Sequence, residues 1–466
     1  MKDLTFESAL SLATAIRSKQ ISCVEVMDAH LEQIARINTP LNALVHVFAD
    51  TARQQASAAD DALASGNVSG PFHGVPMTVK DAWELAGAPS TGGTIGRSHY
   101  IPDHDATVIA RMRSAGAIPI GMTNVPELSL AFESDNLIYG RTSNPWNLSR
   151  TAGGSGGGGA AAIASGMSPV EIGADLGGSI RLPSHFCGTA GLRLTTGRAP
   201  MTGYFPPLML GWVGDFTACG PMARSVDDLD AAYRVIAGPD WVDPHVFEMP
   251  LRPAIHSVQG LRIAIHVNNG IVPARSDVAA TVERAGRALA EAGAVVDEAV
   301  PPGVDECLDI YLGISNSDAG EGLRALLAAA GTDRSHPNLN AVIAMGEAKP
   351  ASFLHSLQVR RDIYRSRMLS FMKNYDLILC PVHAMPAIKH GTWLNEDVLP
   401  GFSYTIAYNI TGWPGAVVRC GTSVEGLPIG VQAVAQPWRE DVALVVARHI
   451  EAALGGYQPP TLAASA

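Results

Sequence analysis

Lys80, Ser155 and Ser179 could together supply a base, a proton relay and a nucleophile without histidine or a metal ion. The chain has 33 basic residues, of which only six are lysines, so most of its positive charge is carried by arginine. Arginine does not lose its proton near neutral pH, whereas a buried lysine ammonium can. Lys80 is the only lysine between Gln20 and Gly346, and it lies in an apolar segment. A lysine buried there could lose its proton, so we expect Lys80 to act as a base.

The segment around Lys80 has the pattern of a strand. In residues 74–81, GVPMTVKD, large apolar side chains fall at alternate positions, as on a strand with one face in the core. Lys80 lies near the end of this strand on the opposite face. The ordinary alternative is a lysine that reaches solvent from the strand end, since most lysines are solvated.

Bulk composition indicates a large soluble α/β protein. With 466 residues, 47% apolar and 17% charged, the chain can bury one large domain or two ordinary ones. A net charge of −11 without a basic run argues against nucleic acid and favours a small or neutral partner.

No stretch is long and apolar enough for a membrane span, and the charged N-terminus is no signal peptide, so we expect a cytoplasmic protein without a membrane partner.

The six cysteines form no metal-binding spacing. We therefore expect reduced, buried thiols, no metal and no cofactor.

Local patterns alternate between strands and helices. Residues 2–65 have helical spacing with a break at Asn38-Thr39-Pro40, and 71–200 contain short apolar runs separated by turns and helical pieces. Later strands are expected at 261–267, 294–300 and 376–382, and helices at 277–292 and 356–374.

These patterns predict one α/β/α layered domain over 1–466, with a central mixed, mostly parallel twisted sheet covered by helices. Within it we expect N-terminal helices at 1–70, a catalytic core at 71–200 and a helical lobe at 300–370.

Residues 144–193 are rich in glycine, so their backbone must approach other groups closely or adopt positive φ. Residues 154–159 match G-x-G-x-x-G, and 153–157 match the G-x-S-x-G nucleophile elbow around Ser155. Both motifs need a preceding hydrophobic strand, whereas 144–152 are polar and contain a proline. A third motif, S-x-x-K at 370–373, lies in a charged amphipathic pattern and is better explained as a solvated helix face.

Lys80, the Gly153-Gly154-Ser155 turn and the segment 173–184, GADLGGSIRLPS, resemble the amidase signature family, in which a Ser-cisSer-Lys triad hydrolyses carboxamides. The family includes fatty-acid-amide-hydrolase-like enzymes and bacterial amidases. Further similar segments run along the whole chain: TNVPE at 123–127, NPW at 144–146, GPMARSVDDL at 220–229, NITGWPGAVV at 409–418 and GLPIGVQAV at 426–434.

The resemblance implies that Ser179 is the nucleophile, Ser155 the relay and Lys80 the base, with a cis peptide between Gly154 and Ser155. The chemistry is coherent without the family, because a serine hydroxyl needs a neighbour to take its proton and neutral lysine can do so through a second hydroxyl.

The turn before the expected nucleophile would supply the oxyanion hole. The backbone N–H groups of Leu176, Gly177 and Gly178 are the expected donors. The resemblance implies that Asp175 and Arg181 brace this loop, and that Ser129 lines the substrate channel; a plain loop serine remains equally compatible.

We therefore expect a serine amidohydrolase that uses water to cleave an uncharged small-molecule amide through an acyl-enzyme. The apolar segment 204–212 could line a binding site for aryl, acyl, fatty or primary amides. Carbamates are also possible substrates, because they are cleaved by the same chemistry. The alternative for this segment is an ordinary buried loop.

Two alternative functions remain. One is the glutaminase (A) subunit of a tRNA-dependent amidotransferase, although the region after Ser317 lacks the serine-rich run expected of it. The other is a non-catalytic binding protein. A homodimer is compatible with the sequence.

Overall fold

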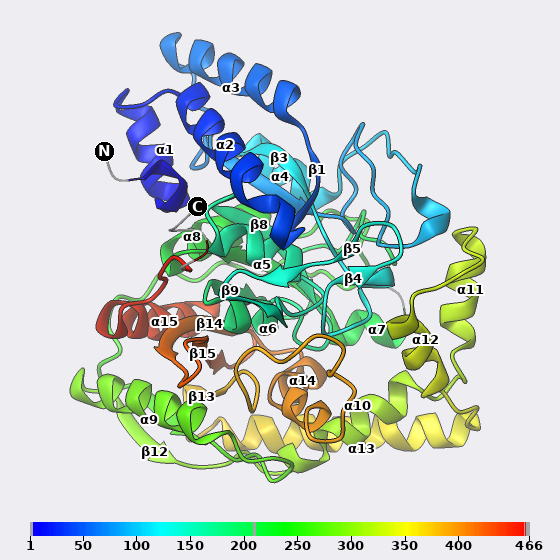
Figure 1. Ribbon diagram of the computed structural model, residues 1–466. Helices are drawn as coiled ribbons and strands as arrows, with labels where there is room; N and C mark the ends of the chain where they lie inside the picture. The colour runs from blue at the N-terminus through cyan, green and yellow to red at the C-terminus, as the bar shows by residue number, and fades with distance from the viewer. Residues whose placement is uncertain (1–2, 208–210, 461, 463–466) are drawn as a thin grey trace.

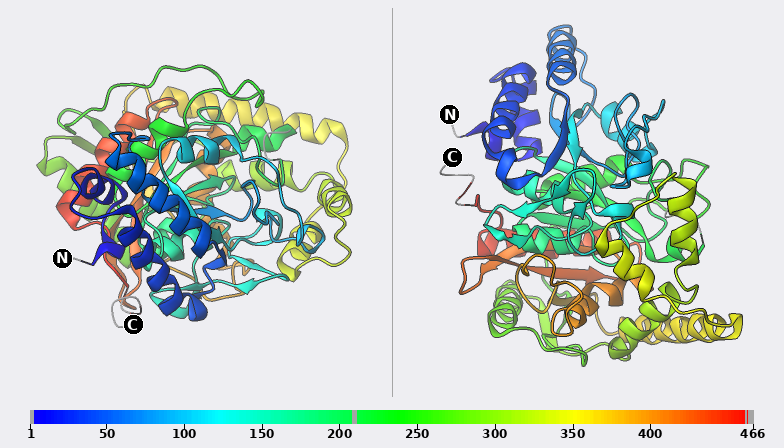
Figure 2. Two further views of the ribbon diagram at one scale, coloured as in Figure 1. Left: turned by 90° about the horizontal axis from the view of Figure 1, so that it is seen from above. Right: turned by 45° about the vertical axis from the view of Figure 1, so that its right-hand side comes forward.

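The computed structural model describes residues 3–207, 211–460 and 462. Its centre is a sheet of 11 strands in the order β1-β3-β2-β8-β10-β9-β14-β15-β13-β11-β12. Helices lie on both faces of this sheet (Figures 1 and 2). The expected layered α/β/α fold around a mixed sheet is confirmed.

The strands of the main sheet are short, and two small hairpins, β4 with β5 and β6 with β7, lie outside it. Their bounds are β1 (Leu44–Val47), β2 (Pro76–Lys80), β3 (Ile118–Thr123), β4 (Asp135–Asn136), β5 (Gly140–Arg141), β6 (Ser143–Asn144), β7 (Asn147–Thr151), β8 (Val170–Asp175), β9 (Ala190–Arg193), β10 (Ala218–Ala223), β11 (Arg262–Ile265), β12 (Val295–Glu298), β13 (Leu377–Pro381), β14 (Gly415–Thr422) and β15 (Pro428–Ala435).

The helices range from 6 residues in α7 to 21 residues in α13. They are α1 (Ala9–Arg17), α2 (Cys23–Leu41), α3 (Ala49–Ala64), α4 (Thr107–Ser114), α5 (Gly157–Ala164), α6 (Arg181–Cys187), α7 (Gly211–Phe216), α8 (Val226–Ile236), α9 (Ser276–Glu291), α10 (Cys307–Ser315), α11 (Glu321–Ala329), α12 (Pro337–Ala344), α13 (Ala351–Phe371), α14 (Ser403–Thr411) and α15 (Glu440–Leu454). The four helices α10–α13 occupy the segment expected to form a helical lobe.

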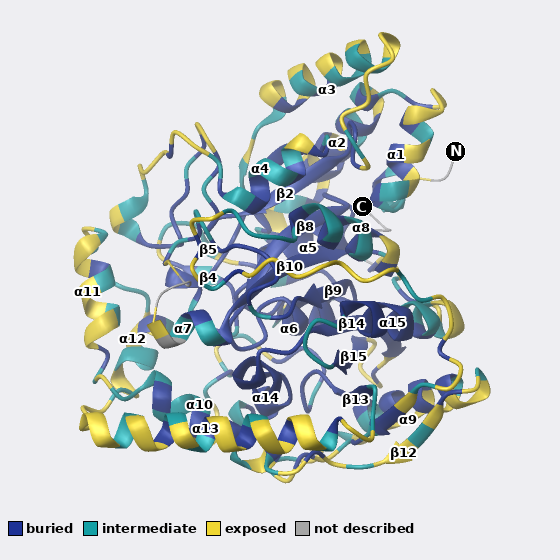
Figure 3. Cartoon of the chain, turned by 180° about the vertical axis from the view of Figure 1, so that it is seen from behind, coloured by how far each residue is buried: buried dark blue, intermediate teal, exposed yellow. Residues whose placement is uncertain are grey.

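Two groups of helices sandwich the central strands. On one face α8 packs against α4 and α15, and α15 packs against α9. On the other face α5 packs against α6, and both contact the sheet. The strands between them are buried, whereas the outer face of α13 is exposed (Figure 3). Among the described residues, none of the helices combines the length and hydrophobicity that crossing a bilayer requires.

The sheet is mixed as expected, but it is not mostly parallel. Four of its strand pairings are parallel and six are antiparallel. Strand β8, for example, pairs in parallel with β2 and antiparallel with β10. All of its residues are buried, and a strand covered on both faces has the same apolar composition in either orientation.

The N-terminal region differs from its expected pattern in two places. Helix α2 does not break at Asn38-Thr39-Pro40 but continues to Leu41, where Asn42 ends it in a left-handed conformation. Pro40 falls in the last turn, so only Leu41 follows it in the helix. Strand β1, which was not expected, adds to the edge of the sheet by pairing with β3.

The glycines of α5 allow that helix to lie directly on its neighbours. A Cβ on Gly158 would come within 2.5 Å of the Asn124 backbone, and one on Gly159 within 1.9 Å of the Glu171 carboxylate. Close backbone approach therefore explains part of the glycine-rich segment, as the sequence indicated.

Candidate active site

Lys80 ends strand β2 and is completely buried. Its Nζ donates hydrogen bonds to the Ser155 Oγ at 2.8 Å and to the Tyr204 hydroxyl at 2.7 Å. Within the described part of the chain, no carboxylate forms an ion pair with it. The alternative of a solvent-reaching lysine is therefore wrong, and Lys80 meets the hydroxyl with which it was expected to work.

Ser155 lies in the turn between β7 and α5, and the peptide joining it to Gly154 is cis, as the resemblance implied. Ser134 holds this turn through three contacts. Its Oγ donates to the carbonyls of Gly153 and Ser155 at 3.2 and 3.3 Å, and accepts from the Gly157 N–H at 3.1 Å. The Ser155 hydroxyl is thereby directed to Lys80 by the fold of its own turn.

Ser179 lies in the turn that leads from β8 into α6, with 6% of its surface exposed. The Gly156 N–H donates to the Ser179 carbonyl at 3.1 Å, so the two glycine-rich turns are joined through their backbones. The Ser155 and Ser179 hydroxyls are not hydrogen-bonded to each other.

Asp175 organises the turn that carries Ser179. Its carboxylate accepts from the Gly178 N–H at 2.8 Å and from Arg181 Nε and Nη2, both at 2.9 Å. Asn409, from α14, donates to the same carboxylate at 2.8 Å. The bracing expected of Asp175 and Arg181 is present.

The ion pairs of Asp175 are fully buried. Burial alone would raise the pKa of Asp175, but the guanidinium groups of Arg181 and Arg193 outweigh it and hold that pKa well below its usual range. Burial also lowers the pKa of Arg193 to about 9, although Asp175 opposes this shift. The charged forms of Asp175 and Arg193 are therefore each favoured by the other member of the buried ion pair.

Replacing Asp175 by asparagine should lower the free energy of unfolding by about 3 kcal/mol or more, because Arg181 and Arg193 would remain buried without a counter-charge. Urea unfolding of wild type and variant measures the difference. Asp230→Asn is the matched control, since its ion pair with Arg234 is partly exposed and should contribute at most about 1 kcal/mol. Equal losses in the two variants would contradict the special role of Asp175.

The same turn presents backbone donors to the cavity. Of the three expected oxyanion-hole donors, the Gly178 N–H already donates to the Asp175 carboxylate at 2.8 Å. The N–H groups of Leu176, Gly177 and Ser179 have no acceptor among the described residues. Thr405 Oγ1 donates to the Gly177 carbonyl at 2.7 Å, which fixes the orientation of that peptide.

Gly178 could not be replaced without distorting the turn. Its φ is +131°, and an added Cβ would lie 2.7 Å from both Leu182 and Thr405.

An apolar cavity of about 350 Å³ opens above Ser179. Phe132 lies in its wall, stacked on Phe402 with ring centroids 3.8 Å apart. Asp318 is the only charged side chain among the described residues that line it. Its other lining residues are Ser129, Leu130, Ala131, Leu176, Gly177, Pro206, Pro207, Val213, Leu308, Tyr311, Leu312, Ser315, Asn316, Gly322, Leu323, Leu326, Val342, Met345, Trp393, Leu399 and Ile406.

The segment expected to wall a site, 204–212, contributes in part. Pro206 and Pro207 line the cavity, and Tyr204 lies beside Lys80, whereas 208–210 fall outside the described residues. Ser129 lines the cavity as expected and accepts a hydrogen bond from the Tyr204 hydroxyl at 3.0 Å.

The sequence did not predict three hydrogen-bond partners in the site. They are Tyr204, which accepts from Lys80, Ser134, which holds the Ser155 turn, and Asn409, which donates to Asp175. Asn409 and Tyr204 stood in segments already singled out, but for other reasons. The motif at 370–373 takes no part in the site, because Ser370 and Lys373 are exposed at the end of α13. Among the described residues, no group of histidine, cysteine and acidic side chains has the arrangement of a metal site.

Comparison with known proteins identifies the family. Residues 25–444 match the family described as Amidase. The chain therefore belongs to the amidase family and is an amidase, a hydrolase of carbon–nitrogen bonds.

Its relatives differ in what they are named for. An acylamidase of Rhodococcus erythropolis is 31% identical over 97% of this chain and 96% of its own. A glutamyl-tRNA(Gln) amidotransferase subunit from Roseiflexus castenholzii is 33% identical over 92% of this chain and 91% of its own. The structure of a bacterial aryl acylamidase of the amidase signature family superposes with a TM-score of 0.87 at 27% identity, covering 99% of each chain.

Proposed function

We propose that this amidase cleaves uncharged amides that carry an apolar acyl or aryl group, with Ser179 as nucleophile, Ser155 as relay and Lys80 as base. The observation that carries this assignment is the completely buried Lys80 Nζ, hydrogen-bonded to the Ser155 hydroxyl, beneath an apolar cavity that contains Ser179.

The first half of the reaction forms an acyl-enzyme. Ser179 Oγ attacks the amide carbon while its proton passes to Ser155 Oγ and the Ser155 proton passes to neutral Lys80 Nζ. The negative charge on the substrate oxygen is met by the free N–H groups at Leu176, Gly177 and Ser179. When the C–N bond breaks, the proton on Lys80 returns through Ser155 to the leaving amine.

The second half repeats the relay with water. Water attacks the ester carbon of acylated Ser179 and loses its proton through Ser155 to Lys80. Collapse of this intermediate breaks the bond to Ser179 Oγ, which recovers a proton through the same path. The products are a carboxylic acid and an amine, and Lys80 is neutral again.

Tyr204 is a positioning residue in this scheme. Its hydroxyl donates to Ser129, so it offers a lone pair to one N–H of Lys80. With that N–H fixed, the lone pair of the neutral amine can accept the Ser155 proton.

Tyr204→Phe should lower kcat for an anilide by roughly 10- to 100-fold with little change in KM, because the lost hydrogen bond orients the base rather than the substrate. Steady-state kinetics separates the two constants. Tyr233→Phe, which changes another buried tyrosine in α8, should keep both constants within about twofold. A rise in KM without loss of kcat would place Tyr204 in substrate binding instead.

The cavity supports apolar substrates. Its walls are mostly aromatic and aliphatic, Asp318 is the one charged side chain among its described lining residues, and none of those residues is cationic. Asp318 could pair with the α-ammonium of glutamine, but the described lining offers no cation to its α-carboxylate, and transfer of an unpaired charge into an apolar cavity is unfavourable. The cavity therefore disfavours glutaminase activity as the alternative, despite the similarity to amidotransferase subunits.

A substrate panel tests the proposed specificity. We expect kcat/KM for hexananilide and hexanamide to exceed that for glutamine by about 100-fold or more. Adipamic acid, which has the acyl length of hexanamide but ends in a carboxylate, is the matched control and should be similarly poor. Preference for glutamine would favour the amidotransferase function, whereas no turnover and no labelling by a fluorophosphonate would favour a non-catalytic binding protein.

A further inference from the structure

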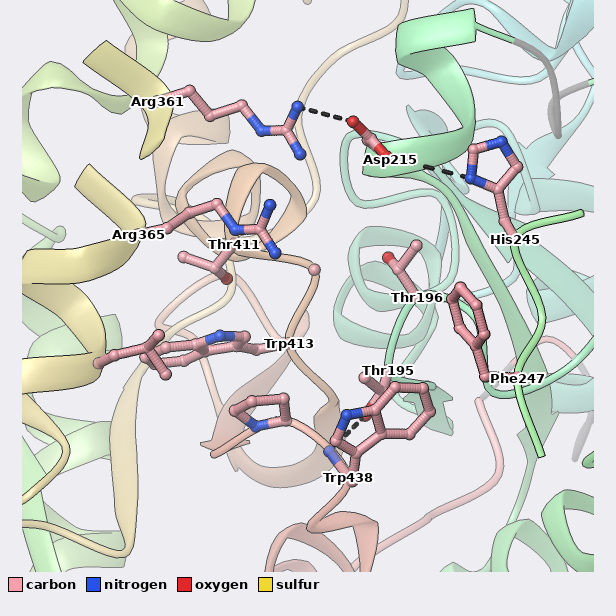
Figure 4. Close-up of a pocket in the computed structure, with 13 residues that line it drawn as sticks. Thr195, Thr196, Asp215, His245, Phe247, Arg361, Arg365, Thr411, Trp413 and Trp438 are labelled. Atoms are coloured by element: carbon pink, nitrogen blue, oxygen red, sulfur yellow. Dashed lines mark hydrogen bonds and ion pairs between the residues drawn. The ribbon is translucent and has the colours of Figure 1, made fainter. Parts of the chain in front are cut away.

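A second cavity of about 260 Å³ lies beside α7 and has a different chemical character from the first. Helix α7 contributes Val213 to the first cavity and Asp215 to the second. The remaining walls come from α13, from loops around Thr196 and Phe247, and from the turns at Trp413 and Trp438 (Figure 4). Segments far apart in the sequence thus converge on it.

Two arginines of α13 point into this cavity from one face of the helix (Figure 4). Arg361, 4% exposed, donates to Asp215 at 2.8 Å and lies over the Phe216 ring. Arg365, one turn later and half-buried, makes no hydrogen bond or ion pair with any described residue. Arg361 therefore has an acidic partner, whereas the Arg365 guanidinium faces the cavity without a hydrogen-bond partner among the described residues.

The second cavity has more cationic than anionic side chains among its described lining residues, although the whole protein has a negative net charge. Asp215 is the only carboxylate among its described lining residues, and it lies between Arg361 and His245, whose Nδ1 is 4.0 Å away. Burial lowers the pKa of Arg365, and the neighbouring Arg361 adds to this effect, whereas Asp215 and the exposed Asp362 oppose it. An anion beside Arg365 would favour its charged form.

The other walls combine aromatic and aliphatic side chains with three threonines, Thr195, Thr196 and Thr411. Trp413, Trp438 and Phe247 bring three aromatic side chains to the same space. The Trp413 indole N–H has no hydrogen-bond acceptor among the described residues. A volume of about 260 Å³ suits a small organic molecule rather than a long chain.

We propose that this cavity binds a small aromatic carboxylate, with the carboxylate paired to Arg365 and the ring among Trp413, Trp438 and Phe247. A planar guanidinium is well suited to hold a carboxylate by two parallel hydrogen bonds. The site shares no lining residue with the first cavity, and it does not depend on the reaction proposed above.

Calorimetric titration of the full chain with phenylacetate tests the site. Phenylacetate should bind at least about tenfold more tightly than 2-phenylethanol, which lacks the charge, and than acetate, which lacks the ring. Equal binding of the alcohol would overturn the role of Arg365, equal binding of acetate that of the aromatic walls, and no binding of phenylacetate the whole site.

A pair of variants on the same helix locates the binding. Arg365→Gln should weaken phenylacetate binding by about tenfold or more, whereas Arg367→Gln, which alters an exposed arginine paired with Glu306, should leave it within about twofold. Unchanged binding in Arg365→Gln would overturn the assignment. A crystal structure of the wild-type complex needs no variant: a carboxylate within hydrogen-bond distance of Arg365 supports the site, and phenylacetate bound elsewhere contradicts it.

Discussion

Replacing Ser179 by alanine is expected to lower kcat/KM for an acyl anilide by about 10⁴-fold or more, since no acyl-enzyme can then form. The change removes one hydroxyl from the floor of the apolar cavity, and the Asp175 hydrogen bonds that hold the turn do not involve it. The variant should therefore fold normally. Anilide hydrolysis measures the loss, and mass spectrometry after fluorophosphonate treatment shows whether a covalent adduct remains.

Two serine variants serve as controls for this result. Ser184→Ala removes a buried hydroxyl in α6 whose one hydrogen-bond partner among the described residues is the Ile180 carbonyl, and should lower kcat/KM at most a few-fold. Ser155→Ala should also be nearly inactive, because the path to Lys80 is broken. Labelling of Ser155 in the Ser179→Ala variant would instead make Ser155 the nucleophile, as its G-x-S-x-G motif suggests.

Lys80→Met should reduce kcat/KM by about 10³- to 10⁴-fold at neutral pH, because methionine fills the buried space but cannot accept the Ser155 proton. Burial of the neutral side chain leaves no unpaired charge, so the thermal unfolding midpoint should not fall. Activity and unfolding together separate lost catalysis from lost folding.

Lys80→Arg distinguishes a base from a mere positive charge. Arginine keeps the charge but is not deprotonated in proteins, so this variant should be as inactive as Lys80→Met. Lys349→Met, at a partly exposed lysine paired with Glu347, is the matched control and should retain activity within about twofold. Substantial activity in Lys80→Arg would mean that Lys80 acts electrostatically.

The sequence predicted those features of the site that depend on residues close together in the chain. The alternating pattern of 74–81 and the scarcity of lysine together predicted an unusual Lys80, and the structure buries it against Ser155. Tyr204 lies 124 positions away and meets Lys80 only through tertiary packing, which no local pattern reports. The peptide N–H groups from Leu176 to Gly178 look equivalent in sequence, and only the shape of the turn shows that Asp175 takes the last one.

The same distinction holds for the fold. Runs of apolar residues located β8 and β13, in which every residue is buried, and β11, which is buried only at its centre. Strand direction depends on how the chain returns to the sheet, so the antiparallel pairs around β10 and β14 were not predicted. Pro40 misled for another reason: it lies in the last turn of α2, where only Leu41 follows it in the helix.

The brace of the Ser179 turn has a consequence for the order in which the enzyme is made. Its partners Thr405 and Asn409 come from α14, and Gln432, which accepts from Arg181, comes from β15. These groups follow Asp175 by more than 220 positions, so a nascent chain carries Lys80, Ser155 and Ser179 long before it can lock their geometry. Contacts of such wide separation form late in folding. We therefore expect the turn of Ser179, the proposed nucleophile, to reach its final geometry only after β15 has been translated.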